Sequence, residues 1–452
     1  MNSKDTICAL ATAPGGALGI IRVSGPDAFA AVSSVCSVRC ECVAANTVHY
    51  THITDGTEVI DEAMVTVFRA PHSYTGEDSV EISCHGSRYI LNKVLELLMQ
   101  NGCRMATPGE YTMRAYLNGK LDLSQAEAVA DLIASTNRVT HHLAMSQLRG
   151  GISSQLATLR EQLLKLTSLL ELELDFSDHE DLEFADRTEL QQLANTINHH
   201  ITQLAHSFET GQALKQGIPV AIVGKTNVGK STLLNRLLND ERAIVSDIHG
   251  TTRDTIEDVM DIRGVQFRFI DTAGIRQTED QVEQIGIQRT YQAIEKARIV
   301  LWLIDEHPIE TEIHQIIKHA QGRPLIIVWN KSDLGNIHNF PSPIPNSQLI
   351  EISAKYGTNI PALEQAIYEA ADIPTLTDTD VIITNARHYD SLIRAQQNLS
   401  RVINGLTIDT SGDLLSEDLR LVLSDLTEIT GKGQITPTEV LGNIFQNFCV
   451  GK

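Results

Sequence analysis

The sequence lacks any apolar run of the about 18 residues that a membrane-spanning helix needs. Its first residues, MNSKDTICALATAPGG, hold a short apolar patch but not the layout of a secretory signal. We therefore expect a cytoplasmic protein with no membrane association. Internal repeats and low-complexity segments are also missing. The length of 452 residues is enough for several separate globular domains.

An excess of basic charge is missing as well. The 36 Lys and Arg residues stand against 57 Asp and Glu, which gives a formal net charge of −21. This balance argues against a broad electrostatic surface for nucleic acid, although a local basic groove is compatible with it.

The seven cysteines do not form the even, regularly spaced set of a disulfide framework, which indicates reduced thiols. Cys36, Cys40 and Cys42 lie close together in the sequence. A structural zinc site normally takes four ligands in paired spacing. We therefore favour structural or incidental thiols over a metal site for this cluster.

Residues 1–118 mix short β-like runs with turns. The runs at 19–23 and 63–68 predict strands, and residues 89–100 predict a helix. This mixture predicts an α+β domain.

Residues 119–215 and 376–452 have a helical pattern, with apolar residues three and four apart. Residues 436–439, TPTE, form a capping box that opens a last helix. We expect one helical bundle domain that is split in the sequence. Its seams are Ile152, Leu156, Leu159, Leu163, Leu166 and Leu170, and Leu415, Leu419, Val422, Leu426 and Ile429.

Residues 216–375 alternate nearly continuous apolar runs with helical segments. The runs lie at 220–223, 267–270, 299–304 and 325–329. This alternation predicts a doubly wound α/β domain with a mostly parallel sheet, inserted in the helical domain.

Residues 224–231 read GKTNVGKS and match the phosphate-binding pattern G-x-x-x-x-G-K-[ST] between an apolar run and a helix. In such a loop, backbone N–H groups at a helix N-terminus hold phosphates. Lys230 is expected to reach the β- and γ-phosphates in a catalytic role, and Ser231 to bind Mg²⁺. The predicted nucleotide contacts are Asn227, Val228, Gly229, Lys230, Ser231 and Thr232.

A D-x-x-G motif follows the run 267–270, and we expect it to approach Mg²⁺ and the γ-phosphate. Its residues are Asp271, Thr272, Ala273 and Gly274. Between the two phosphate motifs lies a switch segment, in which Thr252 is the predicted Mg²⁺ ligand. Its predicted nucleotide contacts are Ser246, Asp247, Ile248, His249, Gly250, Thr251 and Thr252.

Two further motifs select the base. Asn330, Lys331 and Asp333 belong to an N-K-x-D motif, whose carboxylate can accept from guanine N1–H and the N2 amine. A second loop is expected to place a backbone N–H on guanine O6, and its residues are Ser353, Ala354 and Lys355. Together the motifs predict a GTP-binding P-loop domain.

A water-orienting glutamine is missing. Many GTPases place it directly after D-x-x-G, where this chain has Ile275. The positive charge that the transition state needs could come from Arg253, Arg276 or a bound cation. The Asn227 side-chain oxygen suits an alkali cation, but the residue could equally be an ordinary loop residue.

Several segments together resemble the MnmE (TrmE) family of bacterial tRNA-modifying GTPases, and the resemblance covers essentially the whole chain. The segments are IIRVSG at 20–25, SYTGED at 73–78, PGEYT at 108–112, NGKLDL at 118–123, GTTRD at 250–254 and FCVGK at 448–452.

This resemblance implies an N-terminal domain similar to tetrahydrofolate-binding folds, which forms a homodimer. It implies a heterotetramer with the FAD-binding protein MnmG and a tRNA substrate. This protein and MnmG together would install an aminomethyl or carboxymethylaminomethyl group at C5 of the wobble uridine. The one-carbon donor would be (6S)-5-formyltetrahydrofolate or another tetrahydrofolate form.

The resemblance also implies roles for particular residues. K⁺ would be held by Asn227, Ser246, Ile248 and Thr251, and Glu283 would orient the attacking water. The folate site would comprise Arg22, Glu81, Lys120 and Lys452. Cys449 would take part in the modification chemistry.

Two alternatives compete with this interpretation. An Era-type GTPase of ribosome assembly is expected to carry a basic RNA-binding domain after the G domain. A dynamin-like GTPase would need a membrane-binding segment. The helical segment after residue 375 favours neither, because it is not strongly basic and is not a membrane segment.

Overall fold

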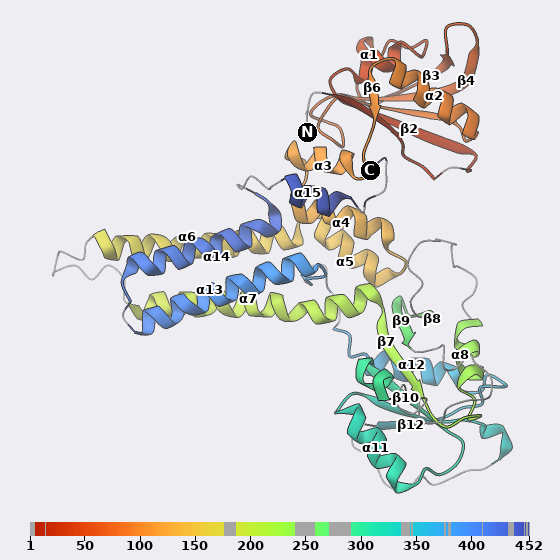
Figure 1. Cartoon of the computed structure of the whole chain (residues 1–452), viewed down its shortest axis with the longest axis vertical. Coiled ribbons are helices and arrows are strands. Elements are labelled where there is room, and N and C mark those ends of the chain that lie inside the picture. Colours follow the sequence, from red (N-terminus) through yellow and green to blue (C-terminus); the bar gives the residue numbers. More distant parts are fainter. Residues whose placement is uncertain are drawn as a thin grey trace. The chain divides into compact units, whose positions relative to one another are not determined.

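The computed structural model describes residues 5–13, 15–175, 187–239, 258–270, 291–335, 344, 347–374, 377, 381–408, 410–432, 438–446, 448 and 451. These residues form two compact units (Figure 1). Unit 1 comprises residues 1–134, 144–202 and 390–452, and unit 2 comprises residues 135–143 and 203–389. Unit 1 thus takes its residues from both sides of unit 2, as an inserted domain requires. Among the described helices, none has the length and apolar character to cross a bilayer.

The N-terminal part of unit 1 is a six-stranded sheet in the order β3-β4-β5-β2-β1-β6. Neighbouring strands are antiparallel except for the parallel pair β1 and β6. The predicted strands and helix of this part are confirmed. The elements are β1 (Thr6–Leu10), β2 (Leu18–Ser24), α1 (Ala28–Ser33), η1 (Cys40–Cys42), β3 (Thr47–Thr54), β4 (Val59–Phe68), β5 (Ser79–His85), α2 (Arg88–Gln100), β6 (Cys103–Met105) and α3 (Glu110–Leu117).

The two faces of this sheet have different covers, because side chains alternate along a strand. On one face Cys8 of β1 joins the cluster that α1 and α2 cover, with Phe29 and Leu98 among its members. On the other face Ile7 packs against Tyr111 of α3. Helix α3 therefore covers the face of the sheet that carries the side chains of Ile7 and Ala9 of β1.

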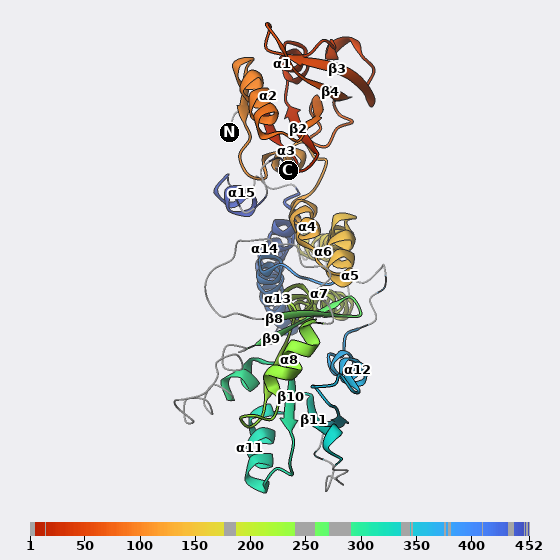
Figure 2. The same cartoon turned by 90° about the vertical axis from the view of Figure 1, so that its right-hand side faces the viewer.

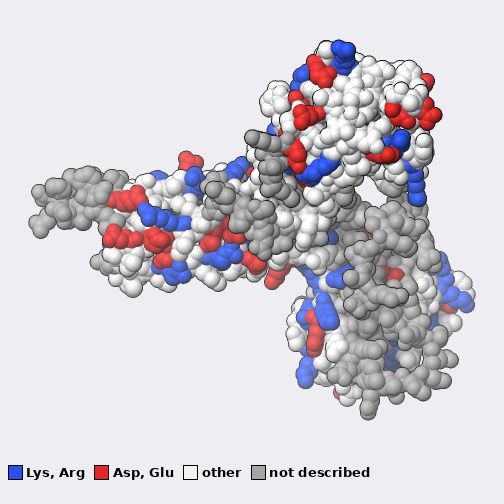
Figure 3. Space-filling model, turned by 45° about the horizontal axis from the view of Figure 1, so that its top comes forward, with Lys and Arg blue, Asp and Glu red and all other residues white. Residues whose placement is uncertain are grey.

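Long helices form the rest of unit 1, and Figures 1 and 2 show α6 beside α14. Both predicted apolar seams are buried in these helices. Mixed charges cover the long helices (Figure 3). Among the ion pairs of these helices, Arg394 pairs with Asp425 and Arg401 pairs with Asp418. The elements are α4 (Leu123–Ala134), α5 (Arg138–Leu148), α6 (Gly151–Asp175), α7 (Arg187–Gln216), α13 (Ala386–Thr407), α14 (Gly412–Thr430) and α15 (Thr438–Phe445). Helices α5, α7 and α13 each contain residues that are assigned to both units.

Unit 2 is built on a second six-stranded sheet, in the order β12-β11-β10-β7-β9-β8. Every neighbouring pair is parallel except β8 and β9, so the prediction of a mostly parallel sheet is confirmed. The elements are β7 (Ile218–Val223), α8 (Lys230–Asn239), β8 (Asp258–Ile262), β9 (Val265–Ile270), β10 (Ile299–Ile304), α11 (Glu310–Ala320), β11 (Leu325–Trp329), η2 (Ser332–Leu334), β12 (Ser347–Glu351) and α12 (Ile360–Ala370).

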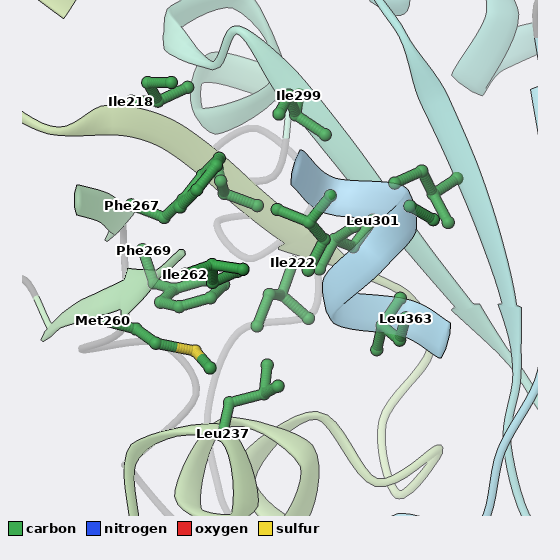
Figure 4. Close-up of a cluster of buried hydrophobic side chains, with 14 of the residues drawn as sticks. Ile218, Ile222, Leu237, Met260, Ile262, Phe267, Phe269, Ile299, Leu301 and Leu363 are labelled. Carbon is green, nitrogen blue, oxygen red and sulfur yellow. The ribbon is translucent and has the colours of Figure 1, made fainter. Parts of the chain in front are cut away.

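Both faces of the second sheet are buried, which explains its nearly continuous apolar strands. On one face Ile222 and Leu301 pack against Leu237 of α8 and Leu363 of α12 (Figure 4). On the other face alternate strand residues, such as Trp302, pack with α11. Strands β7, β10 and β11 are thereby fixed in the centre, and their carboxyl ends meet at one edge.

A buried ionic cluster holds α3 to the first sheet. The Glu110 carboxylate is 2% exposed and accepts from Arg104, from Arg114 and from the Thr107 N–H. Arg114 also pairs with Asp5 and Glu77. Burial alone would raise the pKa of Glu110. The hydrogen bonds that its carboxylate accepts from Arg104, from the Thr107 N–H and from Arg114 outweigh this effect and lower the pKa to about 2.

We predict that Glu110→Gln lowers the free energy of unfolding of unit 1 at pH 7 by about 3 kcal/mol. Because the folded pKa of Glu110 lies below its ordinary 4.5, this contribution is present above about pH 4.5 and is lost as the pH falls through about 2. The variant should therefore also show a flatter dependence of stability on pH in this range.

Urea unfolding followed by circular dichroism measures the effect, and tryptophan fluorescence serves as an internal reference because Trp302 and Trp329 both lie in unit 2. The control is Glu96→Gln, since Glu96 is 52% exposed and its contacts with Lys93 and Gln100 lie at the surface. It should change stability by less than about 0.5 kcal/mol. Equal stability of the Glu110 variant and the wild type at pH 7 would contradict the assignment.

Candidate nucleotide and folate sites

The predicted phosphate loop connects the end of β7 to the start of α8. Gly224 has φ +151°, and a Cβ there would lie 2.4 Å from the Leu303 carbonyl oxygen of β10. Gly229 has φ +101°, and a Cβ there would lie 2.3 Å from the Asn330 side-chain nitrogen. Both positions therefore require glycine for conformation and for space.

Lys230 begins α8 and folds back over this loop. Its amine donates to the carbonyl oxygens of Gly224 and Lys225, at 2.6 Å each. Burial lowers the pKa of Lys230. The ammonium is thus held at the helix N-terminus, where the backbone N–H groups also favour an anion.

The other predicted contacts of this loop differ in exposure. Asn227, Ser231 and Thr232 are exposed, whereas Val228 is buried. Asn227 has φ +61°, in the left-handed region that asparagine tolerates better than most residues. The side chains of Ser231 and Asn227 each carry an oxygen atom, which is the kind of ligand that hard cations such as Mg²⁺ and K⁺ take.

Asn330 joins the phosphate loop to the second base-selecting loop. It follows β11, is 3% exposed, and donates from Nδ2 to the Val228 carbonyl oxygen at 2.8 Å. Its Oδ1 accepts from the Ala354 N–H at 3.0 Å. The side chain that sequence reasoning assigned to the nucleotide therefore bridges the two loops that would surround it.

Asp333 lies beside the same loop, and its Oδ1 accepts from the Ser353 hydroxyl at 2.6 Å. The residue is exposed, so its carboxylate is open to a base. Lys331 has φ +64°, and its amine pairs with Asp305 at 2.6 Å. The structure thus brings Asn330, Asp333 and Ser353 together at the carboxyl ends of neighbouring strands.

One residue of this region was missed by sequence reasoning. Arg236 of α8 donates to the carbonyl oxygens of Ala354 and Lys355. Its position, 118 residues before Ala354, matches no motif, so the sequence held no signal for this contact.

Many predicted site residues lie outside the described residues, and their predicted roles stay predictions. They are Ser246, Asp247, Ile248, His249, Gly250, Thr251, Thr252, Asp271, Thr272, Ala273, Gly274, Glu283, Cys449 and Lys452.

The predicted folate residues Arg22 and Glu81 face each other across β2 and β5. Arg22 donates from Nε and Nη2 to Glu81 Oε1, at 2.9 and 2.7 Å. The Arg22 guanidinium lies 5.5 Å from the Tyr74 ring centre and 5.6 Å from that of Tyr111. Sequence reasoning missed both tyrosines, because only the folded sheet brings them to Arg22.

Lys120 reaches the same surroundings through one loop. Its amine donates to the Pro71 carbonyl oxygen at 3.0 Å, and Asn118 donates to the Thr75 carbonyl oxygen at 2.7 Å. Tyr74, between these two acceptors, lies against Arg22. The loop at 71–75 thus connects Lys120 with the Arg22–Glu81 pair.

Gly451 also contacts this pair. Arg22 Nη1 donates to the Gly451 carbonyl oxygen at 3.2 Å. Gly451 is buried, and a Cβ there would lie 2.4 Å from the Leu10 carbonyl oxygen. Gly451 is therefore held against β1 and β2.

Comparisons with known proteins agree with this architecture. A family model described as "GTP-binding protein TrmE N-terminus" matches residues 6–120, and one described as "MnmE helical domain" matches residues 123–449. The tRNA modification GTPase MnmE of Bacteroides thetaiotaomicron is 53% identical, and that of Phocaeicola vulgatus is 52% identical, each over the whole of both chains.

Among solved structures, the G domain of the T. maritima FeoB iron transporter is 21% identical, with a TM-score of 0.25. That match covers 34% of this chain and 99% of the FeoB G domain. The family assignment rests on the full-length relatives and the two family models. The chain belongs to the MnmE (TrmE) family of tRNA modification GTPases.

Proposed function

We propose that this protein hydrolyses GTP and that this hydrolysis serves tRNA modification. The observation that carries the proposal is the Asn330 side chain, which connects the phosphate loop to the base-selecting loop beside Asp333. A guanine nucleotide spans both loops, because its phosphates and its base bind at opposite ends. Family membership supports the tRNA step.

Different residues bind different parts of the nucleotide. The Lys230 ammonium leaves its two carbonyl partners for the β- and γ-phosphates, and Ser231 holds Mg²⁺. The Asp333 carboxylate, oriented by Ser353, accepts from guanine N1–H and the N2 amine. Adenine offers no such pair of donors, so this contact selects guanine. Thr252 and Asp271 complete the Mg²⁺ surroundings.

K⁺ supplies the positive charge that an arginine finger supplies in other GTPases. Asn227, Ser246, Ile248 and Thr251 would hold it, with Ile248 contributing its backbone carbonyl. Glu283 orients the attacking water, since Ile275 cannot. The exposed position of Asn227 within the phosphate loop supports this assignment.

The modification takes place on tRNA together with an FAD-binding partner, MnmG, in a heterotetramer that contains a homodimer of this chain. The product carries an aminomethyl or carboxymethylaminomethyl group at C5 of the wobble uridine. A tetrahydrofolate form, such as (6S)-5-formyltetrahydrofolate, supplies the one-carbon unit. Cys449 takes part in this chemistry. The reaction takes place in the cytoplasm.

The folate binds at the Arg22–Glu81 pair with Lys120 and Lys452. The pair is about one-fifth to one-quarter exposed, and Tyr74 beside it is 40% exposed. A planar, polar ring system suits a carboxylate and a guanidinium between aromatic rings. The exposure and the chemistry of these side chains support the folate assignment.

The domain boundaries that follow are 1–118, 119–215, 216–375 and 376–452. The Era-type alternative is not favoured, because the helical-domain model of the MnmE family covers residues 123–449. The helices α13 and α14 stand where that alternative would place an RNA-binding domain.

Potassium is predicted to raise GTP turnover by the full chain with Mg²⁺ about tenfold or more over sodium at equal ionic strength. Asn227→Gly should abolish the difference, because glycine keeps the φ of +61° while removing the oxygen donor. Phosphate release measured in KCl and in NaCl gives both rates. Equal wild-type rates in the two salts would refute the K⁺ assignment.

Arg22→Met is predicted to weaken binding of (6S)-5-formyltetrahydrofolate by about 10- to 100-fold, the effect of losing a charged hydrogen-bond donor. Calorimetric titration of the full chain measures this affinity. Arg39→Met, at an exposed arginine of the same unit, is the control and should bind like the wild type. Unchanged affinity of the Arg22 variant would exclude this surface as the folate site.

A further inference from the structure

Arg236 connects the helix that follows the phosphate loop to the loop that would face guanine O6. It lies six residues after Lys230 on α8, a rise of about 9 Å along the helix. Its Nη2 donates to the Lys355 carbonyl oxygen at 2.8 Å, and its Nε donates to the Ala354 carbonyl oxygen at 3.4 Å. Both acceptors belong to the backbone of the base-selecting loop.

Helix α8 is a firm support for this contact. Leu233, Leu234 and Leu237 bury one side of the helix in the core of unit 2, and Arg236 is half-buried beside them. The position of its guanidinium is therefore set by the same helix that presents Lys230 to the phosphates.

The loop itself is a tight turn with internal bonds. The N–H groups of Gly357 and Thr358 donate to the Ser353 carbonyl oxygen at 2.8 and 3.1 Å, and Gly357 has φ +76°. Asn330 fixes the Ala354 N–H, whereas Arg236 fixes the carbonyl oxygens of Ala354 and Lys355. A peptide plane that is held at its oxygen also has its N–H side fixed, since the peptide is planar.

We propose that Arg236 is a positioning residue for guanine recognition, which holds the Ala354–Lys355 backbone so that this loop presents an N–H to guanine O6. The inference rests on the proposed GTP site and adds the residue that sets its O6 contact. It also connects base recognition to phosphate binding, because both then depend on α8.

Arginine suits this role better than lysine. Its planar fork donates in fixed directions, so it can hold two neighbouring carbonyl oxygens at once, whereas a lysine ammonium acts as a point charge. Arg236→Lys should therefore restore only part of what Arg236→Met removes.

The experiment compares equilibrium binding of GDP, 6-thio-GDP and IDP by the full chain with Mg²⁺. Sulfur is a weak acceptor, so the ratio of GDP to 6-thio-GDP affinity reports the O6 contact. IDP lacks the exocyclic amine, so the ratio of GDP to IDP affinity reports the Asp333 contact. The matched control is Arg323→Met, since Arg323 also donates to two backbone carbonyl oxygens of unit 2, those of Ala320 and Glu295.

The wild type and Arg323→Met should prefer GDP over 6-thio-GDP by about tenfold, the effect of one hydrogen bond. Arg236→Met should bring this ratio close to one and leave the GDP-to-IDP ratio unchanged, with Arg236→Lys in between. An unchanged 6-thio ratio in Arg236→Met would overturn the inference, as would an equal loss of both ratios, which indicates general damage to the site. Failure of the wild type to bind GDP would overturn the proposed function itself.

Discussion

The buried amide of Asn330 is the interaction on which the nucleotide site depends. A buried polar side chain that loses a partner costs about 1–3 kcal/mol, and this amide has a partner on each side, the Val228 carbonyl oxygen and the Ala354 N–H. The two loops therefore keep their relative position. The same contact explains Gly229, since any side chain there would collide with the Asn330 nitrogen.

The second sheet provides the frame for this contact. Its central strands β7, β10 and β11 are parallel and buried on both faces. Their carboxyl ends consequently meet at one edge, and the phosphate loop and the Asn330 segment both leave from it. In unit 1 the ionic cluster around Glu110 has a comparable effect. Arg114 of α3 pairs with both Glu110 and Glu77, and so it holds α3 to the loop that carries Glu77.

Local patterns predicted most of this fold. Strands β7, β9, β10 and β11 and the helices α6 and α14 were predictable because the spacing of apolar residues indicates burial directly. The phosphate loop was predictable because its backbone geometry requires glycine. The side-chain partners were not predictable in the same way. Arg236 meets Ala354 across 118 residues, and Tyr111 meets Arg22 only because α3 covers one face of the sheet.

The roles of Glu283 and Cys449 remain predictions from the family resemblance, since neither lies among the described residues. The central claim is that a guanine-nucleotide site built around Asn330 drives tRNA modification. Mass spectrometry of tRNA nucleosides from a strain without this chain tests it most directly. We predict loss of the C5 modification of wobble uridine, restored by the wild-type chain but not by Asn330→Ala. Unchanged tRNA nucleosides, with accumulation of immature ribosomal particles, would contradict it.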